Sequence, residues 1–240
     1  MSINHDAFRN YLQFEKKYSP HTIKAYCDDL ISFQSYNYLN FEHEEIDQVE
    51  YSQIRSWIVS LVDDGVSNVS VNRKIASLKA YYRFLLKTKQ IEISPLVKHQ
   101  ALKVPRVIQI PFSEKEVTAV LIQMQMAVGF EEIRNKLIID LLYTSGMRRA
   151  ELIHLKMQNI NLSAATIKVL GKRNKERIIP VLPIVIDQFS SYIKERRSLE
   201  VVDSDYFFLT KKGLKLNESF VYRLINTYFS TVSEKVKKSP

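Results

Sequence analysis

The stretch LLYTSGMRRAELIHL, residues 141–155, decides how the second half of the chain is interpreted. An apolar run ends here at Gly146, a residue type that commonly follows the last turn of a helix. The next turn carries Arg148 and Arg149, with Glu151 shortly after. The pattern predicts two helices separated by a turn. The Arg148–Glu151 spacing also fits an ordinary salt bridge on a helix face, so the stretch alone does not indicate a function.

A second informative stretch is ATIKVLGKRNKERIIPV, residues 165–181. Alternation through Ile167 and Val169, and then through Ile178 and Val181, predicts two strands joined by a turn around Gly171. The turn GKRNKER holds four cationic residues within seven positions. Such a tip can lie against phosphates, where each contact adds salt-dependent affinity. Turns are usually polar, however, so a merely solvated tip explains this segment as well.

The rest of the chain predicts a mainly α-helical protein of two domains. Only five glycines occur in 240 residues, and Val71, Ile75, Leu78, Tyr82 and Leu85 follow the spacing of one apolar helix face. Ser19 and Pro20 suit the start of a helix, and Ser113 with Glu116 has the spacing of a capping box. Three prolines in residues 94–113 predict an extended linker. We therefore expect a helical domain over residues 1–104 and a second domain over residues 105–240.

Charge and hydropathy narrow the class of protein. Residues 1–100 hold twelve basic and twelve acidic residues, so residues 101–240 carry the whole net charge of +9. This excess favours a polyanionic partner such as nucleic acid, although generally basic proteins are common. No apolar run reaches the ~18 residues of a membrane span, and the first residues lack a signal-peptide pattern. The sequence predicts a cytoplasmic protein, and the single cysteine, Cys27, predicts no internal disulfide.

Together, TSGMRRAEL (residues 144–152) and VLGKRNKERIIPV (residues 169–181) resemble the tyrosine recombinase, or phage integrase, superfamily, particularly its Xer-type members. The resemblance extends to residues 8–30 and 71–87, which are similar to the family's helical, SAM-like core-binding domain. It implies a mostly helical catalytic domain with a small antiparallel sheet, and two domains that form a C-shaped clamp on duplex DNA. It also implies strand exchange through a 3′-phosphotyrosyl intermediate, without a metal, cofactor or small-molecule substrate, by protomers assembled on DNA.

The resemblance assigns roles to particular residues. Arg148 matches the first catalytic arginine, and its planar guanidinium suits two phosphate oxygens. Lys172 matches the hairpin lysine that acts as general acid on the departing 5′ oxygen, and Glu151 would support Arg148. Arg149 is expected to be surface charge. Further DNA contacts are expected from the following residues, which are a weaker inference from helix faces and the turn: Lys175, Arg177, Thr22, Tyr26, Arg73 and Lys74.

Half of the family's site has no match in the sequence. None of the five histidines has an arginine three residues later, and the chain ends at KVKKSP where similar proteins continue into that motif. Tyr222 and Tyr228 lie in a helical pattern whose neighbours suggest core packing rather than a nucleophile. We therefore expect a truncated, monomeric chain that cannot cleave DNA alone. Two alternatives stay open: a non-catalytic accessory or regulatory DNA-binding protein of recombination sites, and a scaffold for acidic proteins.

Overall fold

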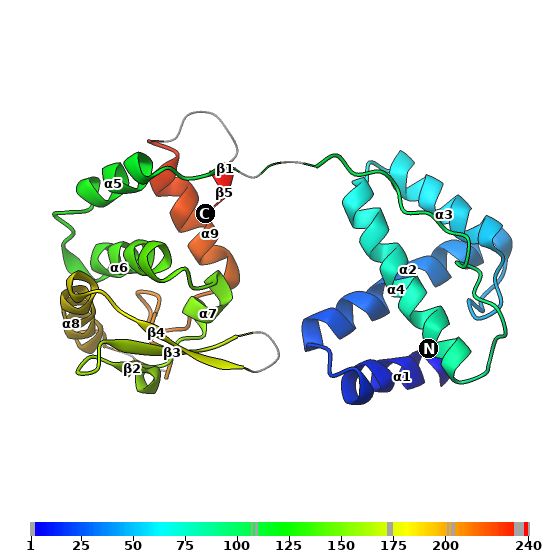
Figure 1. Cartoon of the computed structure of the whole chain (residues 1–240), viewed down its shortest axis with the longest axis horizontal. Coiled ribbons are helices and arrows are strands. Elements are labelled where there is room, and N and C mark those ends of the chain that lie inside the picture. Colours follow the sequence, from blue (N-terminus) through cyan, green and yellow to red (C-terminus); the bar gives the residue numbers. More distant parts are fainter. Residues whose placement is uncertain are drawn as a thin grey trace. The chain divides into compact units, whose positions relative to one another are not determined.

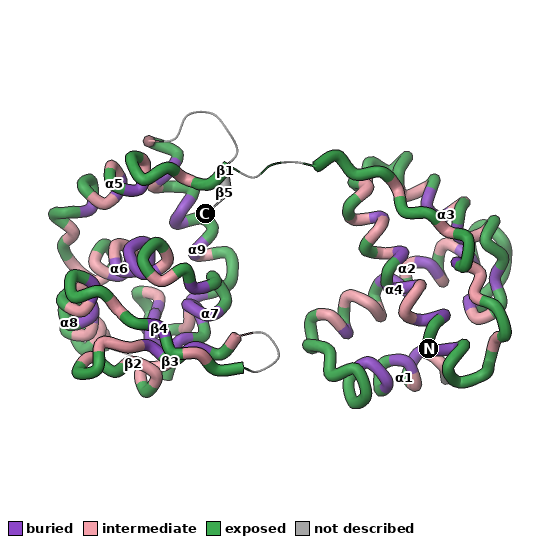
Figure 2. Tube along the Cα trace, in the orientation of Figure 1, coloured by how far each residue is buried: buried purple, intermediate pink, exposed green. Residues whose placement is uncertain are grey.

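The structure is a computed structural model of the chain that describes residues 3–106, 108, 110–171, 175–200, 202, 205–232 and 238–239. It divides into two compact units, residues 1–107 and residues 108–240. Each unit has its own cluster of buried apolar side chains (Figure 2). Both are built mainly of helices, and the second also contains a small antiparallel sheet (Figure 1). The predicted fold class is confirmed. No helix in the described ranges is long and apolar enough to cross a membrane.

The first unit is a helical bundle in which α2 and α4 pack against each other and α3 contacts both. Its elements are α1 (Ile3–Asn10), the short π-helix η1 (Tyr11–Glu15), α2 (Pro20–Phe41), α3 (Tyr51–Asp63) and α4 (Asn68–Lys87). The apolar face predicted on α4 is confirmed, because every one of its five residues is buried. Aromatic rings fill much of this core: Phe33 packs against Trp57, and Phe8 against Tyr81.

The start of α2 follows from its first residues. The Ser19 hydroxyl accepts a hydrogen bond from the Thr22 amide at 3.2 Å, and Pro20 occupies the first helical position. That amide would otherwise lack an intrahelical partner, and proline has no amide hydrogen to leave unpaired. The predicted helix start is confirmed. The helix continues to Phe41, six residues beyond the stretch that the pattern covered.

The segment predicted as an extended linker is attached to α4 at two consecutive residues, Leu102 and Lys103. The Asn72 side chain donates to the Leu102 carbonyl and accepts from the Leu102 amide, both at 2.9 Å. Asn68 donates to the Lys103 carbonyl at 2.9 Å. An asparagine amide carries both a donor and an acceptor, so it can pair with a backbone as a neighbouring strand would. Proline spacing revealed the extended conformation, but not this attachment.

The second unit surrounds a three-stranded antiparallel sheet of order β2-β3-β4. Its helices are α5 (Glu114–Gln123), α6 (Gly129–Ser145), α7 (Arg149–Ile153), the 3-10 turn η2 (Met157–Asn159), α8 (Pro183–Arg197) and α9 (Glu218–Phe229). The strands are β2 (Ile160–Asn161), β3 (Thr166–Leu170) and β4 (Glu176–Pro180), and a separate parallel pair joins β1 (Ile110–Pro111) to β5 (Lys238–Ser239). The capping box of Ser113 and Glu116 opens α5 as predicted.

The hairpin of β3 and β4 is confirmed, and the structure shows which face of β4 is buried, a point that the sequence pattern left open. Ile167 and Val169 are buried as expected, whereas Ile178 is 70% exposed. The buried apolar residue of β4 is Ile179, which pairs with Ile167, and the residue on the same face is Arg177. A one-residue shift moves every side chain of a strand to the other face. The pair of isoleucines at 178 and 179 left that phase undecided, and Arg177 is therefore directed toward the body of the unit.

Candidate functional site

The opening stretch forms a helix end, a turn and a new helix, as predicted. Helix α6 ends at Ser145, and Gly146 follows it with φ +59°, a left-handed conformation that glycine adopts without steric cost. Arg148 is the residue that caps the N-terminus of α7, and its extended backbone places its side chain beside Glu151. The Glu151 carboxylate accepts a hydrogen bond from the Arg148 backbone amide at 2.8 Å and another from Arg148 Nη1 at 2.8 Å.

Glu151 has a second cationic partner that comes from the sheet. Arg177 Nη1 donates to Glu151 Oε1 at 2.8 Å, and Arg177 Nη2 donates to Glu151 Oε2 at 2.9 Å. Parallel hydrogen bonds of this kind between a guanidinium and a carboxylate are strong and fix the geometry of both groups. The sequence predicts a DNA contact for Arg177, and the spacing in the sequence gives no sign that this side chain reaches Glu151.

Gly171 lies against this ion pair at the base of the hairpin. Its amide donates to the Lys175 carbonyl at 2.7 Å. A Cβ added at Gly171 would stand 3.3 Å from the Lys175 carbonyl oxygen, 3.5 Å from Arg177 Nη1 and 3.6 Å from Glu151 Oε1. A side chain at position 171 would therefore touch the pair, and glycine leaves that space open. Lys172, the predicted general acid, lies outside the described residues.

The Glu151 cluster leaves the positively charged guanidinium of Arg148 exposed to solvent. Burial alone would raise the pKa of Glu151, but the hydrogen bonds from Arg177 and Arg148 outweigh it and lower that pKa. Glu151 is therefore ionised at neutral pH, and one negative charge is shared by two positive ones. The Glu151 side chain is only 5% exposed, whereas that of Arg148 is 58% exposed. Among the described residues the Arg148 guanidinium donates only through Nη1, so most of its donors face water and are available to an anion.

Two of the predicted site residues of the first unit, Arg73 and Lys74, bind another buried carboxylate, that of Asp29. Arg73 donates to both of its oxygens, at 2.6 and 2.8 Å, while Lys74 donates at 3.1 Å and the Ser77 hydroxyl at 2.7 Å. Thr22 and Tyr26 are partly buried on the same helix as Asp29. Sequence reasoning missed Asp29 and Ser77, and the one available signal was the Asp28–Asp29 pair inside an apolar helical pattern.

The remaining expectations have mixed outcomes. Lys175 is exposed at the base of the hairpin tip, and Arg149 is exposed beside Arg148. Tyr228 packs against the core of the second unit, as its neighbours suggested. The same inference was wrong for Tyr222, which is 53% exposed, because that position of α9 faces away from the buried Val221 and Leu224.

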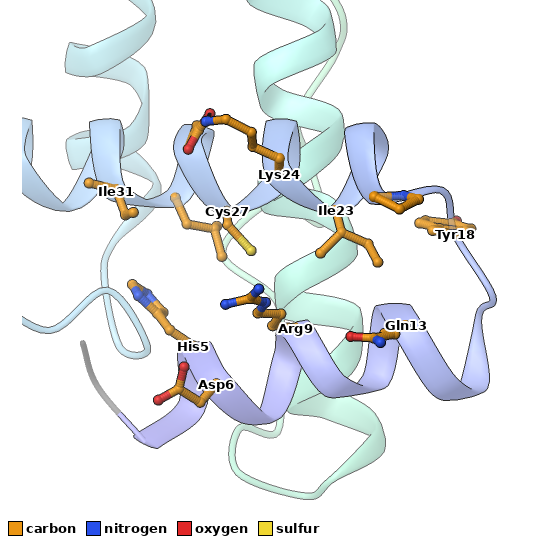
Figure 3. Close-up of a pocket in the computed structure, with 12 residues that line it drawn as sticks. His5, Asp6, Arg9, Gln13, Tyr18, Ile23, Lys24, Cys27 and Ile31 are labelled. Carbon is orange, nitrogen blue, oxygen red and sulfur yellow. Dashed lines mark hydrogen bonds and ion pairs between the residues drawn. The ribbon is translucent and has the colours of Figure 1, made fainter. Parts of the chain in front are cut away.

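A cavity of about 480 Å³ lies between α1 and α2 in the first unit (Figure 3). His5 and Arg9 point into it from α1, while Ile23 and Cys27 point into it from α2. Burial raises the pKa of the Cys27 thiol, so that thiol is protonated at neutral pH and is a poor nucleophile. None of the predicted site residues lines this cavity.

No group of three or more histidine, cysteine, aspartate or glutamate side chains in the described part of the chain could hold a metal ion. The expectation that no metal is needed stays a prediction.

Comparisons with known proteins agree with these features. A model described as "Phage integrase, N-terminal SAM-like domain" matches residues 6–89, and one described as "Phage integrase family" matches residues 111–238. The chain is 32% identical over 221 residues to the tyrosine recombinase XerC of Staphylococcus epidermidis (strain ATCC 35984), over 92% of this chain and 74% of that protein. It is 30% identical over 221 residues to XerC of Staphylococcus carnosus (strain TM300), with the same two shares.

A solved structure supports the same fold. The crystal structure of the XerH site-specific recombinase bound to its palindromic difH substrate aligns with a TM-score of 0.72 at 18% sequence identity, over 97% of this chain and 69% of that chain. The two family models cover most of this sequence, in the order of its two units. The chain therefore belongs to the tyrosine recombinase (phage integrase) family of site-specific recombinases.

Proposed function

We propose that this chain binds duplex DNA and contributes the Arg148 part of a phosphoryl-transfer site for site-specific strand exchange. One observation carries the proposal: Glu151 holds Arg148 through Nη1 and the backbone, and the rest of the guanidinium is open to solvent. A guanidinium fixed in this way can donate two parallel hydrogen bonds to non-bridging phosphate oxygens. It would stabilise the negative charge that grows on those oxygens in the transition state.

The reaction of a complete site divides into two proton-balanced halves. A tyrosine hydroxyl would attack the phosphorus and give its proton to a general base of the complete site, while the bond to the 5′ oxygen breaks and the DNA 3′ phosphate becomes attached to the tyrosine. Lys172 would protonate the departing 5′ oxygen as general acid. Reversal on a new 5′ hydroxyl rejoins the strand. No metal or cofactor takes part in these steps.

We further propose that these 240 residues bind DNA but do not cleave it by themselves. The sequence contains no histidine with an arginine three residues later, so it lacks one of the groups that would neutralise the phosphate beside Arg148. Tyr222 is exposed on α9, but no second arginine of such a motif accompanies it. Cleavage would then require residues that this sequence does not contain.

The two units would divide the work. The first, proposed as a core-binding domain over residues 1–104, would contact DNA through the face of Thr22 and Tyr26. The second, over residues 105–240, would hold the phosphate site, with Lys175 as a further phosphate contact. Further protomers would assemble on the same DNA, and we propose a cytoplasmic location. A non-catalytic accessory role at recombination sites remains the second candidate, favoured by the missing motif.

Two measurements on the chain test the proposal. Fluorescence anisotropy with a duplex of roughly 30 base pairs should show affinity that falls by the order of a thousandfold between 50 and 200 mM salt, for ~6 phosphate contacts. Arg148→Ala should weaken binding by about tenfold, because a charge-assisted contact is lost, while Arg197→Gln, a charge change at an exposed position of α8, should weaken it little. No affinity at low salt, or equal effects of the two variants, would contradict the proposal.

Cleavage is tested separately with a nicked suicide duplex, which traps covalent adducts. No adduct should survive denaturation. A tyrosine-linked adduct would overturn the proposed inactivity and would also exclude the purely accessory role.

A further inference from the structure

Glu151 is the point where three parts of the second unit meet. Its carboxylate accepts four hydrogen bonds, two from Arg148 and two from Arg177. One partner belongs to the start of α7 and the other to β4, and a Cβ added at Gly171 of the hairpin would stand within 3.6 Å of both charged groups. A buried carboxylate with this many donors has a single well-defined orientation, because any rotation leaves several charged hydrogen bonds unmade.

The side chain of Arg177 is directed inward. It pairs with Val169, which is buried, and it lies on the same face of β4 as Ile179. Its neighbours Glu176 and Ile178 lie on the exposed face. Its terminal nitrogens Nη1 and Nη2 both donate to Glu151. A DNA phosphate that took over both terminal nitrogens of Arg177 would leave a carboxylate that is 5% exposed with two of its four hydrogen bonds and one of its two cationic partners.

We infer that Arg177 is a positioning residue and not a phosphate ligand: by gripping Glu151 it fixes the guanidinium of Arg148 and seats the base of the hairpin. This inference rests on the proposed function, in which Arg148 receives the phosphate. It explains why one carboxylate serves two arginines that would otherwise repel each other. It also ties the orientation of Arg148 to the strand that leads into the hairpin tip.

The inference distinguishes the geometry of Arg177 from its charge. A lysine at this position would keep the charge, but a single ammonium cannot form two parallel hydrogen bonds with a carboxylate. A phosphate ligand would be replaced fairly well by lysine, because a phosphate is also bound by point charges. Arg177→Lys should therefore behave like Arg177→Gln if the residue positions Glu151, and like the unsubstituted chain if it contacts DNA.

The test is a double-mutant cycle on DNA affinity with the whole chain. Duplex binding is measured across salt for the unsubstituted chain, Arg148→Ala, Arg177→Gln, Arg177→Lys and the Arg148→Ala/Arg177→Gln double variant. Arg148→Ala should lower the steepness of log affinity against log salt by about 0.9, the value for one phosphate. Each Arg177 variant should weaken binding several-fold on its own, but by less than twofold once Arg148 has been replaced. The double variant should keep the salt slope of Arg148→Ala.

The opposite results identify which claim fails. The inference is overturned if the losses of DNA affinity from the Arg177 and Arg148 substitutions multiply in the double variant. It is also overturned if the slope of log affinity against log salt falls by about 1.8 in that variant, or if Arg177→Lys binds DNA as the unsubstituted chain does. Each of these results would mean that Arg177 contacts phosphate. If Arg148→Ala itself leaves affinity and slope unchanged, the proposed function fails instead.

Glu151→Gln provides an independent variant, and thermal unfolding checks the fold of every protein used. The substitution keeps the size of the side chain but removes the charge that holds both arginines. It should reproduce the Arg177→Gln affinity, with no further loss in the Glu151→Gln/Arg177→Gln double variant. Additive losses in that pair would also overturn the inference. Arg197→Gln is the charge-matched control, because Arg197 is exposed at the last turn of α8.

Discussion

Each unit of the molecule contains one buried carboxylate that receives two cationic side chains. In the first unit Asp29 on α2 binds Arg73 and Lys74, and in the second Glu151 on α7 binds Arg148 and Arg177. Both carboxylates are almost fully buried, and both have a lowered pKa. The two clusters consist of similar residue types. Residue type alone therefore does not show which cluster only stabilises the fold and which could bind a ligand.

The two clusters differ in where the donors come from and in what they leave free. Every side-chain donor to Asp29 belongs to α4, so the cluster fastens one helix to another. Arg73, its half-exposed arginine, donates through both terminal nitrogens to Asp29, whereas Arg148 gives Glu151 only Nη1. A guanidinium that has bound a carboxylate with both terminal nitrogens cannot offer the same pair of nitrogens to a phosphate. The comparison teaches that unused donors, more than exposure, mark the arginine that can receive a ligand.

Removing the negative charge of Asp29 or of Glu151 should have the largest effect on the free energy of unfolding, and the two substitutions should differ in that effect. Asp29→Asn should destabilise the first unit by about 2–4 kcal/mol, since it removes the charge that pairs with the largely buried Lys74 and the half-exposed Arg73. Glu151→Gln should cost about 1–2 kcal/mol, because its arginines are more exposed and can turn to water. Trp57, the only tryptophan, lies in the first unit beside Lys74, so its fluorescence follows that unit during urea unfolding. Circular dichroism follows both units.

Lys24→Met is the control, because Lys24 forms an exposed ion pair with Asp28 one turn from Asp29. It should change the tryptophan midpoint little, since exposed pairs contribute less than about 1 kcal/mol. Equal losses of unfolding free energy from Asp29→Asn and Glu151→Gln would show that the two clusters stabilise their units to the same degree. The proposed difference between the clusters would then be wrong.

A smaller effect should appear on acidification. Burial alone would raise the pKa of Asp29, but the hydrogen bonds from Arg73, Ser77 and Lys74 lower it below its ordinary value. A carboxylate with a depressed pKa contributes stability that is complete above its unfolded pKa, about 3.9, and is lost as pH falls through the folded value. The tryptophan urea midpoint should therefore fall between about pH 5 and pH 2.5.

The Asp29→Asn variant should lack the part of the fall that comes from protonation of Asp29. The difference in urea midpoint between the variant and the unsubstituted chain should therefore become smaller as the pH is lowered. The effect is smaller than that of the substitution, since a protonated Asp29 still accepts hydrogen bonds. A difference that stays constant across this range would mean that Asp29 has an ordinary pKa in the folded protein.

The sequence predicted the helices well where a local signal was present. Ser19 with Pro20, and Ser113 with Glu116, mark helix starts because the caps act within four residues. The predicted pair of Arg148 and Glu151 also lies within one turn. Proline spacing likewise marked the chain segment near Leu102 as extended, although its attachment to Asn72 depends on residues thirty positions apart.

What the sequence did not predict was the set of buried charges and their partners. Asp29 meets Arg73 across 44 positions, and Glu151 meets Arg177 across 26. Arg134, only 2% exposed, donates to the Leu209 carbonyl across 75 positions. Periodicity treats a charged residue as exposed, and only the packing of distant elements shows which ones are enclosed. The buried face of β4 was not predicted for the same reason, because Arg177 occupies an inward position where a pattern of apolar residues is expected.

The smallest predicted effect concerns Gly171, which has no counterpart beside Asp29. A methyl group at this position would stand 3.3 Å from the Lys175 carbonyl oxygen and 3.5 Å from Arg177 Nη1. These neighbours must move by a few tenths of an ångström, so Gly171→Ala should destabilise the second unit by about 1 kcal/mol or less. It should also speed amide exchange at position 171, whose hydrogen bond to Lys175 measures 2.7 Å. The tryptophan signal of the first unit should not change.

Gly146→Ala is the control that distinguishes steric crowding at Gly171 from the backbone strain of a residue with positive φ. Gly146 has φ +59° and no neighbour within 4 Å of an added Cβ, so its substitution costs about 1 kcal/mol through conformation alone. It should leave amide exchange at position 171 unchanged, because no contact links the added methyl group to the hairpin. If Gly171→Ala also left that exchange unchanged, the base of the hairpin would be free of the Glu151–Arg177 pair. The two carboxylate clusters would then differ only in their unused donors, and Glu151 would hold Arg148 without holding the hairpin.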